Sequence, residues 1–281
     1  MTYTCFNVET SDRVAHVRMI RPERANSMIP EFWHELPEII DQLSKGDEAR
    51  VIVLSAEGRH FCSGMDLSVF AGINDVSMQG DSGHISRQRA SFRTTALNLQ
   101  RSFSCLEESR LPVLCAIQGA CIGGGIDMVS ATDLRYATKD AFFSIQEINI
   151  GMTADVGTLQ RMPKLVPEGV VRELAYTGRN MPASEAKERG FVNEIYDDQD
   201  EMVDAVFAIA KEIASKSPMA IWGTKQTLNY GRDHSVADGL EYIATWNAAM
   251  FDPDDMAEAF AAQTEERDAQ FPDHKRFRKG L

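Results

Sequence analysis

Two short apolar runs limit the folds open to this chain more than any other feature. The segments RVIVLSA (50–56) and LPVLCAI (111–117) are apolar at nearly every position, which is typical of strands buried on both faces. Between them, apolar side chains recur at helical spacing from Phe92 to Leu106. A strand, a crossover helix and a second strand predict a parallel sheet.

The remaining segments predict an αβ core followed by helices. Residues 5–20 read as a hairpin, and residues 30–43 as a helix that begins near Pro30. Residues 133–146 read as two strands, and the pattern beyond Gly157 is helical. We therefore expect a core over residues 1–210 and a C-terminal helical region over residues 211–281.

Charge and cysteine content exclude several functional classes. The chain has 29 basic and 42 acidic residues and a net charge of -13, so it repels polyphosphate and is not expected to bind nucleic acid or anionic membranes generally. Any anionic ligand needs a local basic patch. The five cysteines show no C-x-x-C spacing, which argues against a disulfide framework or a cysteine zinc site and favours a reducing compartment.

The sequence also carries no recognisable targeting or membrane segment. Its first residues, MTYTCFNVET, do not pair a basic stretch with an apolar one. Nowhere do about eighteen apolar residues follow one another. We expect a cytoplasmic protein without membrane insertion.

A glycine-containing loop follows each apolar run. EGRHFCSGMDL (57–67) follows the first and GACIGGGID (119–127) follows the second. Loops at the carboxyl ends of neighbouring parallel strands converge on one crevice. A tight turn with close helix packing would also explain the glycines. A dinucleotide site is disfavoured, because Cys121 stands where G-x-G-x-x-G needs its second glycine.

Bare backbone in both loops suggests a particular chemistry. Glycine lets a ligand approach backbone N–H groups closely, and one N–H from each loop can point at the same oxygen. Such an oxyanion hole suits a thioester whose carbonyl becomes an enolate.

The two loops together resemble the crotonase superfamily of enoyl-CoA hydratases and isomerases. The resemblance rests on FCSGMDL (61–67) and GACIGGGIDM (119–128) and extends through RPERANSM (21–28) over nearly the whole chain. It implies an α/β fold, a crotonase-type ββα spiral core with a C-terminal helical region, and assembly into a homotrimer or homohexamer. It also implies an acyl-CoA substrate, no metal and no organic cofactor, since coenzyme A is part of the substrate.

The same resemblance assigns roles to residues in these motifs. The backbone N–H groups of Met65 and Gly124 would form the oxyanion hole. The residues expected along bound acyl-CoA are Arg24, Ser63, Gly64, Asp66 and Leu67. For the phosphates of coenzyme A, Arg21 is a further candidate. The basic residues of the tail are either additional phosphate ligands or solvated side chains; they are Lys275, Arg276, Arg278 and Lys279.

Three acidic positions distinguish members of the superfamily. Hydratases carry glutamate at the positions of Asp127 and Glu147 and glycine near Asp155. The set found here, Asp127, Glu147 and Asp155, resembles the Δ3,5-Δ2,4-dienoyl-CoA isomerases. That resemblance implies conversion of 3,5-dienoyl-CoA to 2,4-dienoyl-CoA in the β-oxidation of unsaturated fatty acids.

The chemistry of that reaction agrees with two separate carboxyl groups. A proton leaves C2 and another arrives at C6, too far apart for one group to serve both. Glu147 and Asp155 could act as base and acid on opposite sides of a flat dienolate, while Asp127, at a helix start that favours its ionised form, orients its neighbours. Each of the three also has a plain structural explanation, as a helix-start charge, a solvated strand end and a loop cap.

Other readings are weaker. Cys62 and Cys121 lack an identifiable histidine partner and are expected to be buried packing residues rather than nucleophiles. A 2-enoyl-CoA hydratase is the nearest rival function, and it would need two carboxylates around one water. The rival from another class is a non-catalytic acyl-CoA-binding or interaction protein on the same fold.

Overall fold

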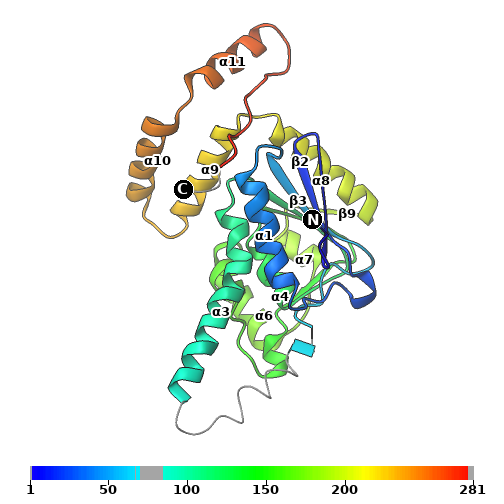
Figure 1. Cartoon of the computed structure of the whole chain (residues 1–281). Helices are drawn as coiled ribbons and strands as arrows, with labels where there is room; N and C mark the ends of the chain where they lie inside the picture. Colours follow the sequence, from blue (N-terminus) through cyan, green and yellow to red (C-terminus); the bar gives the residue numbers. More distant parts are fainter. Residues whose placement is uncertain (1, 67, 70–84, 278–281) are drawn as a thin grey trace.

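The computed structural model describes residues 2–66, 68–69 and 85–277, which form two β-sheets surrounded by helices (Figure 1). The larger sheet has the strand order β1-β2-β3-β4-β6-β9. Its strands are β1 (Phe6–Ser11), β2 (Val14–Met19), β3 (Val51–Ala56), β4 (Val113–Ile117), β6 (Leu134–Thr138) and β9 (Glu194–Tyr196). The β1–β2 hairpin is antiparallel and all later pairs are parallel, so the predicted hairpin and parallel sheet are confirmed.

Both faces of the larger sheet are covered, as the continuous apolar runs predict. Successive side chains of a strand point to opposite faces. Val51 and Val53 of β3 therefore pack with Met202 and Val206 of α8 (Gln199–Ala214). The alternate residues of β3 belong to the main core, which includes side chains of α1 (Phe32–Lys45) and α3 (Ile85–Glu108).

A second, three-stranded sheet completes the spiral. It contains β5 (Ala120–Ile122), β7 (Phe142–Ser144) and β8 (Met181–Pro182). The chain passes from β4 to β5 and then into α4 (Gly124–Ser130), and from β6 to β7 before the next helices. The pairs β4–β5 and β6–β7 each add one strand to each sheet and are followed by helical structure, so the predicted ββα spiral is confirmed.

Helix α1 accommodates Pro37 because of its neighbour α3. Proline has no N–H, so the carbonyl four residues earlier, that of Trp33, loses its helical donor. The Ser102 hydroxyl donates to the Trp33 carbonyl at 2.9 Å instead. This contact fixes α3 against α1 near the carboxyl end of α3.

The remaining helices follow the spiral turns and form the C-terminal region. The core adds η2 (Glu147–Ile150), α5 (Thr158–Arg161), η3 (Met162–Lys164), α6 (Glu168–Thr177) and α7 (Ala183–Glu188). The C-terminal region contains α9 (Pro218–Gly231), α10 (Val236–Met250) and α11 (Pro253–Thr264). In Figure 1, α10 and α11 stand apart from the sheets. The C-terminal helical region is confirmed, while the boundary at residue 210 falls within α8 and stays a prediction.

Polar contacts attach this region to the core. The Lys225 ammonium on α9 is buried and donates to the carbonyls of Leu106 and Leu111 and to the Asp133 carboxylate, at 2.8, 3.0 and 2.8 Å.

No helix among the described residues is long and apolar enough to cross a bilayer.

Candidate active site

A cavity of about 820 Å³ lies between α3 and the two glycine-containing loops. Its wall is largely apolar. Six of the residues implicated by the sequence line it together: Ser63, Gly64, Met65, Gly124, Glu147 and Asp155. The predicted convergence of the loops that follow β3 and β4 is therefore confirmed.

Backbone contacts hold the two loops side by side. Cys62 and Cys121 form a β-bridge, in which the Ile122 N–H donates to the Cys62 carbonyl at 3.0 Å. On the other side of the first loop, the Met28 N–H donates to the Gly64 carbonyl at 2.9 Å. These contacts fix the positions of both backbones before any ligand binds.

The N–H groups of Met65 and Gly124 are left without a described acceptor. No described residue accepts a hydrogen bond from either one. A Cβ atom at Gly124 would lie 4.0 Å from the Met65 nitrogen and only 2.8 Å from the Met28 sulfur. A side chain at Gly124 would force the Met28 side chain to move and would lie close to the Met65 N–H. Without one, two adjacent donors are left that can hold one oxygen.

Glu147, the first residue of η2, is half-buried at this cavity. Its Oε1 atom would lie 3.1 Å from a Cβ at Gly123, next to the Gly124 N–H, and its Oε2 has no partner among the described residues. Burial of the carboxyl, followed by the negative charge of Asp127, raises the pKa of Glu147 to about 7. Such a group can take up or release a proton near neutral pH.

Asp155 reaches the cavity from the loop between η2 and α5. Asp155 as a whole is exposed, but its carboxyl group is partly buried, and this burial raises the pKa of Asp155. The backbone carbonyl of Asp155 accepts a hydrogen bond from the Gln100 amide of α3 at 2.8 Å. Glu147 and Asp155 thus bring two separate carboxyl groups to one cavity.

Asp127 lies behind the cavity wall rather than on it. It is completely buried in α4, and its Oδ1 accepts a hydrogen bond from the Thr158 N–H at the start of α5, at 2.6 Å. Burial raises the pKa of Asp127 to about 6 and outweighs the hydrogen bonds from Thr158. The position of Asp127 at the start of α4 predicts that its ionised form is favoured. This prediction is wrong, because burial has the larger effect on the pKa of Asp127. Asp127 is therefore connected to the cavity only indirectly, by its contact with Thr158 at the start of α5 and by the effect of its negative charge on the pKa of Glu147.

The other predicted substrate residues divide into two groups. Asp66 is buried and does not line the cavity. Its carboxylate accepts hydrogen bonds from Ser68 and Ser27, which lower the pKa of Asp66. Arg24 is 61% exposed and its guanidinium lies 3.7 Å from the Asp66 carboxylate. Leu67 lies outside the described residues. Contact of Arg24, Asp66 or Leu67 with acyl-CoA stays a prediction.

The remaining basic candidates are held by the protein itself. The Arg21 guanidinium donates to the Ser27 carbonyl at 2.6 Å. Arg276 pairs with Asp47 and Glu48, and Lys275 is exposed beside it. Arg278 and Lys279 lie outside the described residues. Arg21 therefore braces the loop before α1, and the described tail lies against the end of that helix.

The two cysteines beside the glycine loops are packing residues, as expected. Cys62 and Cys121 are fully buried and free of disulfides. Burial raises the pKa of the Cys62 thiol to about 12, which leaves it protonated and unreactive at neutral pH.

Sequence patterns missed the α3 wall of the cavity. The apolar residues from Phe92 to Leu106 are recognised only by their helical spacing, and the structure shows that Phe92 is 60% exposed and lines the cavity. Trp33 of α1 also contributes to this wall. Residues 86–95 are mostly polar, so the amino-terminal half of α3 has no apolar face to pack against the core. This composition could have indicated that Phe92 is not a core residue.

Comparison with known proteins agrees with this fold. The family model described as enoyl-CoA hydratase/isomerase matches residues 9–274, and the chain belongs to that family. The solved structure of an enoyl-CoA hydratase from Bacillus anthracis superposes with a TM-score of 0.85 at 26% identity, covering 96% of this chain and 99% of that one.

Two curated relatives are more similar in sequence. The mitochondrial Δ(3,5)-Δ(2,4)-dienoyl-CoA isomerase of Rattus norvegicus is 42% identical over 258 residues, which are 92% of this chain and 78% of the relative. The peroxisomal Δ(3,5)-Δ(2,4)-dienoyl-CoA isomerase of Arabidopsis thaliana is 41% identical over 263 residues, which are 93% of this chain and 94% of the relative.

Proposed function

We propose that this chain is a Δ3,5-Δ2,4-dienoyl-CoA isomerase that acts in the β-oxidation of unsaturated fatty acids. The observation that carries the proposal is the meeting of Glu147, Asp155 and the N–H groups of Met65 and Gly124 at one cavity. The two relatives above 40% identity bear the name of this activity, whereas the hydratase is 26% identical.

The reaction moves one proton off the substrate and another onto it. The thioester oxygen accepts hydrogen bonds from Met65 and Gly124, which stabilises the negative charge that develops when C2 loses its proton. The electron pair shifts along the diene, and C6 gains a proton. One of Glu147 and Asp155 takes the first proton and the other delivers the second.

Asp127 supports both carboxyl groups without touching the substrate. Its hydrogen bond to Thr158 anchors the loop that carries Asp155, and its charge raises the pKa of Glu147. The substrate is neither oxidised nor hydrated, so two proton carriers and an oxyanion hole suffice. We accordingly propose no metal and no organic cofactor.

The decisive experiment follows the dienoyl chromophore of 3,5-octadienoyl-CoA with purified protein. Asp155→Asn removes a direct proton carrier and is expected to lower kcat at least about a hundredfold. Asp204→Asn, an exposed aspartate of α8, is the matched control and should turn over normally. Near-normal turnover by Asp155→Asn would sink the assignment.

The rival functions give different results in the same assay. Hydration of crotonyl-CoA without isomerisation of the diene would identify a 2-enoyl-CoA hydratase. Binding of acyl-CoA without either reaction would identify a non-catalytic acyl-CoA-binding protein. The full set of three acids beside the oxyanion donors favours the isomerase over both.

The acyl-CoA itself is proposed to run from this cavity toward the loop before α1. Ser63 and Gly64 line the cavity, and the exposed Arg24 guanidinium is the cation that we propose for a phosphate of coenzyme A. Asp66 and the neighbouring Leu67 complete the proposed contacts. Arg24→Gln should raise KM and leave kcat nearly unchanged, since it removes uniform binding.

We further propose a homotrimer or homohexamer in the cytoplasm. Large apolar side chains are exposed on α9, α10, α11 and the turn between the last two: Leu228, Val236, Leu240, Phe251, Met256 and Phe260. Exposed large apolar side chains gathered on neighbouring elements favour a protein interface there. Five free thiols support a reducing compartment, although the two relatives are named as mitochondrial and peroxisomal.

A further inference from the structure

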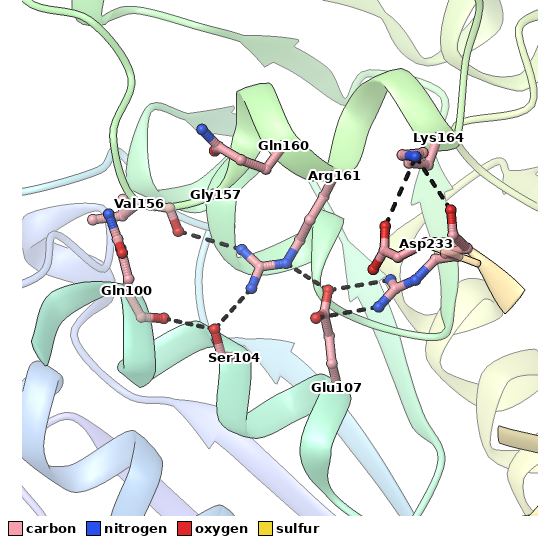
Figure 2. A pocket seen from close by; sticks show the side chains of 10 residues that line it. Gln100, Ser104, Glu107, Val156, Gly157, Gln160, Arg161, Lys164 and Asp233 are labelled. Carbon is pink, nitrogen blue, oxygen red and sulfur yellow. Dashed lines mark hydrogen bonds and ion pairs between the residues drawn. The ribbon is translucent and has the colours of Figure 1, made fainter. Parts of the chain in front are cut away.

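A polar cluster outside the substrate cavity holds the backbone that carries Asp155. Figure 2 shows this cluster around Arg161, which follows Asp155 by six residues. The cluster lines a separate pocket of about 320 Å³, between α3, the start of α5 and the segment after α9. None of the roles assigned above uses it.

Two carbonyls beside the Asp155 side chain are tied to this cluster. The carbonyl of Asp155 accepts from the Gln100 amide at 2.8 Å, and the carbonyl of Val156 accepts from the Arg161 guanidinium at 3.4 Å. The same guanidinium lies against Gly157, where a Cβ would come within 1.7 Å of its Nη1. The conformation of this loop therefore depends on where the Arg161 side chain is held.

Glu107 holds the Arg161 side chain from α3. The Arg161 Nε donates to Glu107 Oε1, and its Nη2 donates to the Ser104 hydroxyl at 3.0 Å. The side chains of Arg161 and Glu107 are only 13% and 17% exposed. A largely desolvated ion pair is held in one geometry, because breaking it leaves a buried charge without a partner.

The C-terminal region reaches the same carboxylate. Arg232, just after α9, donates to Glu107 at 3.3 and 3.4 Å, and Asn229 donates to the Glu107 carbonyl at 3.1 Å. Lys164 in turn donates to the Arg232 carbonyl at 3.2 Å. Among the described residues, no hydrogen bond or ion pair joins Glu147 to these groups.

We propose that Glu107 and Arg161 are positioning residues for Asp155, and that they fix one of the two proton carriers while leaving Glu147 in place. The proposal rests on the isomerase function given above. It predicts a selective defect: one proton transfer is slowed, the other is not, and substrate binding is unchanged. A general structural role would slow both transfers alike.

The test measures hydrogen exchange in D2O together with isomerisation. Exchange is followed at C2 of 3,5-octadienoyl-CoA and at C6 of 2,4-octadienoyl-CoA, so that each proton carrier is observed separately. Glu107→Gln keeps the size of the side chain and removes its charge. We expect kcat for isomerisation to fall about ten- to hundredfold, because a small misplacement of a reacting group costs that much, with KM changed less than about twofold.

The two exchange rates distinguish a positioning role for Asp155 from a general structural role. In Glu107→Gln, exchange should fall with kcat at one carbon and stay within about twofold of wild type at the other. Equal losses at both carbons, or unchanged kcat, would overturn the proposal. Arg172→Gln, which breaks an exposed pair with Glu168 on α6, is the matched control and should alter neither rate.

A second variant protects the test against misfolding. Gln100→Met removes only the amide that donates to the Asp155 carbonyl and leaves the ion pair intact. It should show the same one-sided exchange defect with a smaller loss, about fivefold. If wild-type protein fails to isomerise the diene, the proposed function fails; if wild type is active and both variants exchange normally, only the positioning role fails.

Discussion

The spiral core and the C-terminal helices bury their apolar residues differently. The core encloses large side chains from both sheets and their helices. Beyond Ala214, by contrast, the described residues add no large apolar side chain to the buried core, and α10 has no buried residue. Lys225, Arg232 and other polar groups attach the C-terminal region to the core.

This difference indicates that the core and the C-terminal helices have different functions. The core folds around its own apolar side chains and places the reacting groups, whereas α10 and α11 present apolar surface outward. Since large exposed apolar patches mark interaction sites, we propose that the C-terminal region makes the contacts between subunits. Substitutions in the two regions should therefore change different measured quantities.

The largest expected effect belongs to the core. Glu147→Gln removes a proton carrier whose pKa lies near the working pH, and kcat should fall about a thousandfold. The mass of the assembly, measured by light scattering, should stay the same. Glu188→Gln changes an exposed glutamate at the end of α7 and serves as the control. A fall of less than about tenfold for Glu147→Gln would contradict its role.

The second largest effect is expected for the mass of the assembly, after substitutions in the C-terminal region. Leu240 of α10 and Phe260 of α11 are 64% and 61% exposed, and placing aspartate at both positions puts charges into the proposed interface. We expect the assembly to dissociate toward single chains of 31.3 kDa, seen by sedimentation.

A charge on another side of the same helix provides the control for that variant. Thr245→Asp adds a negative charge to α10 about 140° around the helix from Leu240 and should leave the assembly intact. If the double variant keeps the wild-type mass, these faces do not form the interface.

The smallest effect is the pH dependence of stability, which has opposite signs in the two regions. In the core, the pKa of Glu147 is raised to about 7, so the folded state binds more protons than the unfolded state from about pH 4.5 to 7, and stability falls as pH rises through that window. In α11, hydrogen bonds from Arg267 lower the pKa of Glu258 to about 2. Its contribution is present above about pH 4.5 and is lost as pH falls toward 2.

Melting temperatures of the two variants separate these contributions. From pH 5 to pH 8, Glu147→Gln should lose less stability than wild type does. Glu258→Gln should differ from wild type by a nearly constant and small amount over the same range, because its carboxylate is exposed to solvent. A steeper pH dependence in Glu147→Gln than in wild type would mean that burial does not hold its proton.

Much of the fold was predictable because its signals are local. The runs at 50–56 and 111–117 are strands β3 and β4 with both faces covered, and the loops that follow them meet at the cavity. Helix α3 was less predictable. Its apolar residues have helical spacing, but only the carboxyl end has a core to pack against, so Phe92 faces the cavity.

Sequence alone determined the chemistry available here: backbone without side chains at two strand ends, and three carboxyl groups at Asp127, Glu147 and Asp155. The tertiary structure decided how each carboxyl is used. It buried Asp127 behind the wall and left Glu147 and Asp155 on the cavity. It also tied the Asp155 carbonyl to Gln100 and the neighbouring Val156 carbonyl to Arg161, which pairs with Glu107. Burial and long-range contacts between α3, α4 and α5 set these differences, because desolvation and neighbouring charges depend on residues far apart in the chain.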